Sequence, residues 1–236
     1  MAEYLEDFSD EAVNSLPSKW TRRWVQTGTS LTVRETAEGR YLEVSRNGNH
    51  RCAVTYDPIN ADPDRADIHT RILFRALTTG FDCRALSRVA GTDGNSATGY
   101  AMGSRHTGNA DQIEISRYNN GNFSALAQAG FSVVRDAWYW LETESKGNEQ
   151  RMKVWGMDEP VPSEWTLESV NSNVTAAGPV GFFSFNAGTF HIKEIAFGTG
   201  ADSAPIGLLA TIPKLTGLRA SNITATSITP TVEFEF

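Results

Sequence analysis

The sequence lacks long apolar runs and has only two cysteines, and both shortages limit what the protein can be. No stretch approaches the roughly 18 uninterrupted apolar residues that a membrane-spanning helix needs. The first residues are acidic where a secretory signal would be basic and then apolar, so we expect the protein to stay where it is made, away from membranes. Cys52 and Cys83 have no CxxC motif or Cys/His cluster around them, which disfavours a zinc or redox site.

Positive charge is also scarce, because 21 Lys+Arg face 28 Asp+Glu and leave a net charge of −7. Such an average field repels a phosphate backbone, so we do not expect nucleic acid as a partner. The 236 residues, 40% of them hydrophobic, fit one large folded domain with a short appendage. A domain of this size buries enough surface to fold without disulfides or a structural metal.

A helical period is nearly absent, and the best candidate for a single helical turn is the segment 162–168, with Ser163 as its cap. Elsewhere apolar and polar residues alternate, as in Ile68, Thr70, Ile72 and Phe74, which is typical of strands with one solvated face. An Asn-rich turn at 119–122 predicts a hairpin. The predicted strands cover residues 31–33, 41–45, 53–56, 68–76, 84–90, 100–105, 111–118, 123–129, 138–144, 151–155, 180–185 and 190–197. This pattern predicts an all-β, two-sheet antiparallel jelly-roll sandwich, with a closed barrel as the alternative.

The C-terminal end of the chain has a different composition from the rest. Charge almost disappears after residue 200, and Thr, Ser and Pro become frequent. We therefore expect a main domain at 1–200, a linker at 201–214 and a β-strand extension at 215–236. Two strands are marginal alone in water, so residues 205–236 are expected to dock on the main domain, on other copies of the chain or on a different protein.

Several aromatic segments together carry a resemblance to a known fold family. They are Trp138-Tyr139-Trp140-Leu141-Glu142, Arg151-Met152-Lys153-Val154-Trp155, Glu159-Pro160, Trp165, Gly181-Phe182-Phe183-Ser184-Phe185 and Phe190-His191-Ile192-Lys193-Glu194-Ile195, preceded by Glu6-Asp7-Phe8-Ser9, Pro17 and Trp20-Thr21. This set, over residues 4–200, resembles concanavalin A-like and laminin-G-like jelly-roll domains. The extension 215–236 is similar to the first strands of a fibronectin type III module, of which the rest is missing.

The resemblance also implies where the protein acts. Jelly rolls of this kind with an abbreviated fibronectin-like extension look like bacteriophage virion proteins, in which such modules decorate capsids or tails and adhere to surface glycans. The chain is then expected to be a non-enzymatic virion component, assembled in the host cytoplasm beside other virion proteins and copies of itself. A bacterial cytoplasmic lectin is a further alternative.

An enzyme is the main rival, because the concanavalin A-like superfamily includes glycan hydrolases. Their Glu-x-Asp-x-x-Glu strand motif is absent, and no G-x-S-x-G nucleophile motif occurs. Glu142 and Glu144 do share a strand face about 7 Å apart, a spacing at which an inverting hydrolase could work. Carboxylates that alternate with apolar residues are equally typical of any half-exposed strand, so we expect no enzyme.

A glycan-binding site has clearer candidates. Aromatic faces stack on sugar rings, and Trp140 and Trp155 lie on strands that could line one sheet face. With Arg117 or Arg84 they would form a binding platform. The alternative is that these tryptophans pack beneath the segment that carries Trp165 and close the edge of the sandwich.

We expect no cofactor, and calcium is the one candidate that the sequence offers. Asp57, Asp62, Asp64 and Asp67 lie close together around two prolines, and carboxylate oxygens on loops are the ligands that calcium prefers. Asp93 lies in a second acidic loop. Neither loop has an EF-hand pattern, and a solvated acidic loop without metal is the alternative.

Overall fold

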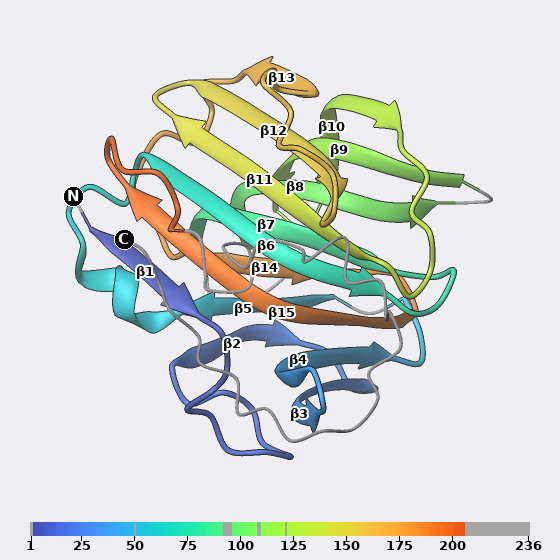
Figure 1. Ribbon diagram of the computed structural model, residues 1–236. Helices are drawn as coiled ribbons and strands as arrows, with labels where there is room; N and C mark the ends of the chain where they lie inside the picture. Colours follow the sequence, from blue (N-terminus) through green and yellow to red (C-terminus); the bar gives the residue numbers. More distant parts are fainter. Residues whose placement is uncertain (1, 50, 92–95, 108–109, 121, 206–236) are drawn as a thin grey trace, which may run out of the picture.

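The computed structural model describes residues 2–205, except residues 50, 92–95, 108–109 and 121. Two antiparallel sheets face each other in this part of the chain, which contains no α-helix and therefore no helix that could span a bilayer (Figure 1). The expected all-β sandwich is confirmed. The extension 215–236 and most of the linker lie outside the described residues.

The front sheet has eight strands. In spatial order they are β13 (Leu167–Val170), β12 (Glu149–Gly156), β11 (Trp138–Lys146), β6 (Ile68–Ala76), β15 (Gly188–Thr199), β4 (Gly39–Arg46) and β3 (Thr29–Thr36), with β1 (Glu3–Glu6) paired to the second half of β15.

The back sheet has seven strands. They are β10 (Asn122–Gly130), β9 (Ala110–Asn119), β8 (Thr98–Thr107), β7 (Asp82–Ala90), β14 (Gly181–Ser184), β5 (Cys52–Tyr56) and β2 (Trp20–Val25). A 3-10 helix, η1 (Asp57–Ala61), follows β5.

Each strand predicted from the sequence overlaps a strand of the structure. The prediction succeeds because apolar side chains alternate along a strand that buries one face. The predicted helical turn at 162–168 is wrong. Leu167 begins β13 there, and it pairs with Met152 on β12. The preceding residues form an irregular connection, so sheet pairing overrides the weak local capping signal.

The core between the sheets is aromatic. The Trp20 ring lies 5.1 Å from Tyr56 and 5.7 Å from Phe182, and Tyr56 stacks on Phe197 at 5.4 Å. These rings join the back sheet to β15 of the front sheet. Cys52 and Cys83 are free and buried in the same core.

The back sheet curls strongly about its outer face. Trp24 on β2 stacks on Tyr118 of β9 at 5.9 Å, although four strands lie between β2 and β9. In a flat sheet these strands would be about 24 Å apart. The outer face is therefore concave, and it is filled by a second cluster of buried side chains that includes Trp24, Tyr118 and Phe183.

Candidate functional site

The outer face of the front sheet carries a charged ladder over strands β12, β11 and β6. The register places Glu142 on β11 between Lys153 and Arg71, and Glu144 between Arg151 and His69. Side chains on a strand alternate between its faces, so both carboxylates project to the same side. The acidic central strand is thus flanked by a basic residue on each side in both rows.

Glu142 is the centre of this ladder and is only 5% exposed. Arg71 Nη2 donates to one carboxylate oxygen at 2.6 Å, and Lys153 Nζ lies 3.6 Å from the other. His69 Nε2 lies 3.0 Å from Glu142 Oε1, while its Nδ1 accepts from the backbone N–H of Ala204 at 3.0 Å. Because Nδ1 is an acceptor, a neutral His69 carries its hydrogen on Nε2, and this N–H donates a hydrogen bond to Glu142 Oε1.

These contacts set the protonation state of Glu142. Burial alone would raise its pKa, but the hydrogen bond from His69 and the charge of Arg71 outweigh burial and hold the pKa at about 2. The carboxylate is therefore ionised at neutral pH. It is a fixed negative charge and does not serve as a proton donor.

Trp140 and Trp155 lie on the same face, opposite each other on β11 and β12, and stack with ring centroids 6.5 Å apart. Each is only 4% exposed. The Lys153 ammonium lies 5.7 Å from the Trp155 ring and 5.0 Å from the Trp165 ring, and it donates to Pro162 O. The two indoles are thus buried, as in the alternative interpretation in which they are packing residues. They do not form the open sugar-binding platform that we expected.

The two arginines expected beside them lie elsewhere. Arg84 is fully buried on the concave face of the back sheet, where it pairs with Asp82 and Glu114. Arg117 is on β9, and it lines a separate pocket at the end of the sandwich. The structure therefore does not bring the four predicted platform residues together, because Trp140 and Trp155 belong to one sheet and the arginines to the other.

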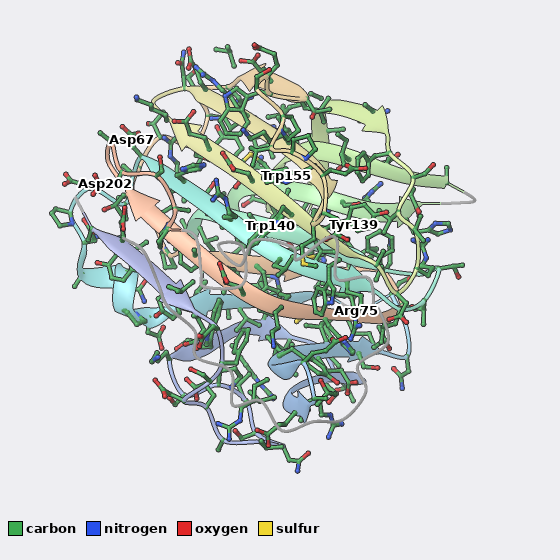
Figure 2. All side chains as sticks on the ribbon, in the orientation of Figure 1. Asp67, Arg75, Tyr139, Trp140, Trp155 and Asp202 are labelled. Carbon is green, nitrogen blue, oxygen red and sulfur yellow. The ribbon has the colours of Figure 1, made fainter. Side chains whose placement is uncertain are left out.

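A cleft of about 330 Å³ opens beside the ladder, at the lower end of the range for small-molecule sites. Its walls include His69, Glu142, Glu144, Arg151, Trp165 and residues 200–203. Asp67 and Asp202 mark its position in Figure 2. Trp165 meets His69 edge-on at 6.3 Å and is partly exposed. An accessible aromatic ring here stands beside several polar side chains.

The four aspartates proposed for calcium do not converge. Asp57 accepts from Thr21, Asp62 accepts from Thr199 and Tyr4, and Asp67 pairs with Arg88. Asp64 also has a partner of its own. Over the described residues no group of three or more His, Cys, Asp or Glu side chains could hold a metal ion, so this candidate calcium site is not assembled. Asp93 lies outside the described residues.

Sequence reasoning missed three residues of the cleft, which are His69, Trp165 and Asp202. They come from β6, the β12–β13 connection and the segment after β15. No local motif connects them. Only the β6–β11–β12 strand order, which the sequence did not reveal, could have placed His69 beside Glu142.

No protein-family model matches this sequence, and no curated protein sequence matches it. Solved structures do resemble it in fold. The exoplasmic/lumenal domain of VIP36 in its Ca²⁺/Man2-bound form has a TM-score of 0.54 and 16% identity, over 85% of this chain and 88% of that one.

Two further solved structures have a similar fold. The Emp46p carbohydrate recognition domain has a TM-score of 0.54 and 11% identity, over 78% of this chain and 90% of that one. A protein of unknown function from Shewanella oneidensis MR-1, SO2946, has a TM-score of 0.53 and 11% identity, over 86% and 89%. At such identities the likeness establishes the fold alone. The chain has a two-sheet antiparallel jelly-roll sandwich fold, similar to that of these carbohydrate-binding domains.

Proposed function

We propose that this protein is a non-enzymatic glycan-binding jelly roll and that the front-sheet cleft is its binding site. The observation that carries the proposal is the partly exposed Trp165 in a cleft with Glu144 and Asp202. The likeness in fold to VIP36 solved with Man2, and to the Emp46p carbohydrate recognition domain, supports the same function.

The chemistry of the cleft suits a sugar. The Trp165 ring offers an apolar face for the C–H side of a pyranose. Glu144 has one distant partner, Arg151 Nε at 3.9 Å, and no hydrogen bond or ion pair within the described residues occupies the Asp202 side chain. Both carboxylates are free to accept hydrogen bonds from sugar hydroxyls.

Binding is favoured over hydrolysis by the state of Glu142. An inverting hydrolase needs one protonated carboxyl group as the acid. The pKa of Glu142 is held at about 2, so this residue is not that acid at neutral pH. A hydrolase remains the alternative function, and release of reducing sugar by the purified protein would favour it.

We expect Trp165→Ala to weaken oligosaccharide binding at least about tenfold, because truncation of a central aromatic contact commonly costs more than about 1.4 kcal/mol. The ligand is chosen on a glycan array and its affinity is measured by calorimetry. Trp138→Ala is the matched control, since Trp138 lines a different, apolar hollow with Leu73 and Met157. Loss of binding in Trp138→Ala, or unchanged binding in Trp165→Ala, would contradict the proposal.

We further propose, from the resemblance of the sequence, that the protein acts in a bacteriophage virion and attaches there through residues 205–236. Particles assembled with a protein that ends at residue 204 should lack it, whereas the full chain should be incorporated, and negative-stain microscopy with quantitative blotting distinguishes the two. Normal incorporation of the shortened protein would refute attachment through this segment.

A further inference from the structure

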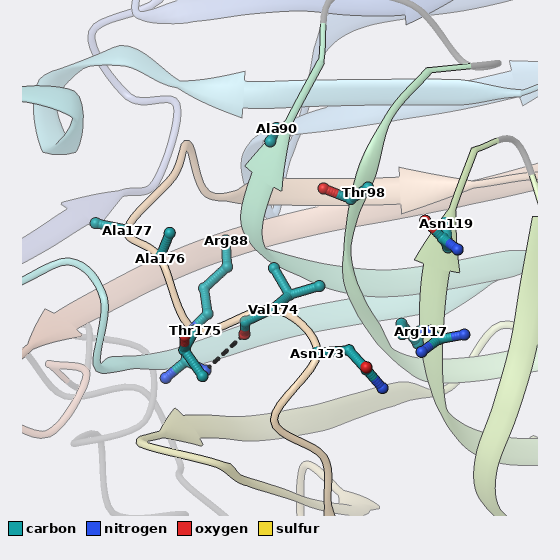
Figure 3. Close-up of a pocket in the computed structure, with 10 residues that line it drawn as sticks. All are labelled: Arg88, Ala90, Thr98, Arg117, Asn119, Asn173, Val174, Thr175, Ala176 and Ala177. Atoms are coloured by element: carbon teal, nitrogen blue, oxygen red, sulfur yellow. Dashed lines mark hydrogen bonds between the residues drawn. The ribbon is translucent and has the colours of Figure 1, made fainter.

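A second pocket, of about 400 Å³, lies at one end of the sandwich (Figure 3). The ion pair of its Arg88 with Asp67 of the front-sheet cleft separates the two sites. The ends of β7, β8 and β9 form one side of it, and residues 173–177 form the other. Its polar lining consists of Arg88, Arg117, Thr98, Asn119, Asn173 and Thr175. It shares no lining residue with the front-sheet cleft.

The loop side of this pocket is firmly held. Arg88, 1% exposed and at φ 53°, donates to Ala66 O at 2.6 Å, Gly147 O at 2.6 Å and Val174 O at 3.0 Å. Tyr100 Oη donates to Asn171 O at 2.8 Å. Such contacts fix the backbone of the loop in place, so little ordering is needed when a ligand enters.

The charges in the pocket are unbalanced. None of its lining residues is acidic, in a chain whose net charge is −7. The Arg88 guanidinium is occupied by the three carbonyls and by Asp67 at 3.3 Å. Arg117, in contrast, makes no hydrogen bond or ion pair with any described residue, and its Nε is buried. A buried guanidinium nitrogen without a partner is costly, and an anion would satisfy it.

We propose that this pocket binds the carboxylate of an acidic sugar, a hexuronate. The Arg117 guanidinium has a planar fork of donors that matches a carboxylate. In Figure 3, Asn119 and Asn173 flank Arg117. Their amides, together with the hydroxyl of Thr98, can donate to and accept from the ring hydroxyls of the same sugar. This site is independent of the front-sheet cleft, and either one can exist without the other.

The test is titration of the full-length protein with glucuronate, with glucose and with acetate, followed by backbone and arginine side-chain NMR signals. We expect glucuronate alone to bind, with shifts at Arg117 and Asn173, and with an affinity that falls as salt rises. Arg117→Gln should weaken it at least about tenfold, as expected for loss of a charge-assisted fork, and Arg117→Lys should restore only part of it.

The controls separate this site from the cleft and from general charge effects. Arg22→Gln removes an exposed arginine on β2 and should leave glucuronate binding unchanged. Trp165→Ala should also leave it unchanged, even if it abolishes binding of a neutral glycan. Equal affinity for acetate and glucuronate, no binding of glucuronate, or unchanged binding in Arg117→Gln would each overturn the proposal. If Arg117→Gln fails to fold, Asn119→Ala gives the same test, because Asn119 is exposed.

Discussion

Replacement of Arg84 by methionine should destabilise the protein by about 3–5 kcal/mol, the usual cost of breaking a buried ion pair from one side. Arg84 and Asp82 are both fully buried, and the guanidinium makes two hydrogen bonds to that carboxylate, at 2.7 and 2.9 Å. It also lies 3.2 Å from Glu114. Methionine keeps most of the volume but leaves two carboxylates without this cation in the filled concave face of the back sheet.

Chemical denaturation of Arg84→Met beside Arg34→Met measures this effect. Arg34 also pairs with a glutamate, Glu43 at 3.1 Å, but its side chain is 41% exposed, so its loss should cost less than about 1 kcal/mol. Asp82→Asn combined with Arg84→Met should recover part of the loss. Equal, small effects of Arg84→Met and Arg34→Met on the free energy of unfolding would contradict the prediction. They would show that water reaches the charged side chains of the concave face.

The second large effect is a pH-dependent loss of stability through Glu142. Its pKa is about 2 in the folded state against 4.5 for an ordinary glutamate, so its ionised form contributes stability above pH 4.5. That contribution, of about 3 kcal/mol, is lost as the pH falls from 4.5 through 2. Glu142→Gln should therefore be about 3 kcal/mol less stable than the parent protein at pH 6, and nearly equal to it near pH 2.

Urea denaturation of both proteins between pH 6 and pH 2 gives the comparison. Glu144→Gln is the matched control, because Glu144 lies two residues along the same strand and its side chain is 26% exposed. Its stability should stay parallel to that of the parent protein throughout. A constant difference between Glu142→Gln and the parent protein would contradict the assignment of this effect to Glu142.

The fold class was predictable because it depends on patterns within short segments of the sequence. Alternation in segments such as Ile68–Ala76 identifies strands one at a time, and a chain made only of strands with short turns has few ways to bury them. The order of the strands in each sheet, in contrast, depends on contacts between segments far apart in sequence. The hydrogen bond between His69 and Glu142 joins residues far apart in sequence through β6–β11 pairing. The one between Ala204 and His69 does so through β6–β15 pairing.

The incorrect parts of the site prediction have the same origin. Trp140, Trp155 and Arg84 are all strand residues with the right chemistry, and alternation does not say which sheet a strand joins. The aspartates of the 57–67 segment are close in sequence, yet each carboxylate has its own partner, such as Thr199 for Asp62 or Arg88 for Asp67. Closeness in sequence therefore did not indicate convergence on one ion.

The most direct measurement of the central proposal is a titration of the protein with an array-selected neutral oligosaccharide, observed through the indole N–H signals of its six tryptophans. If the front-sheet cleft is the glycan site, the Trp165 signal shifts most and saturates with the binding curve, while those of Trp20 and Trp24, on the back sheet, stay in place. Binding that leaves Trp165 unchanged and shifts the Trp24 signal instead would place the site on the concave back sheet and contradict the proposal.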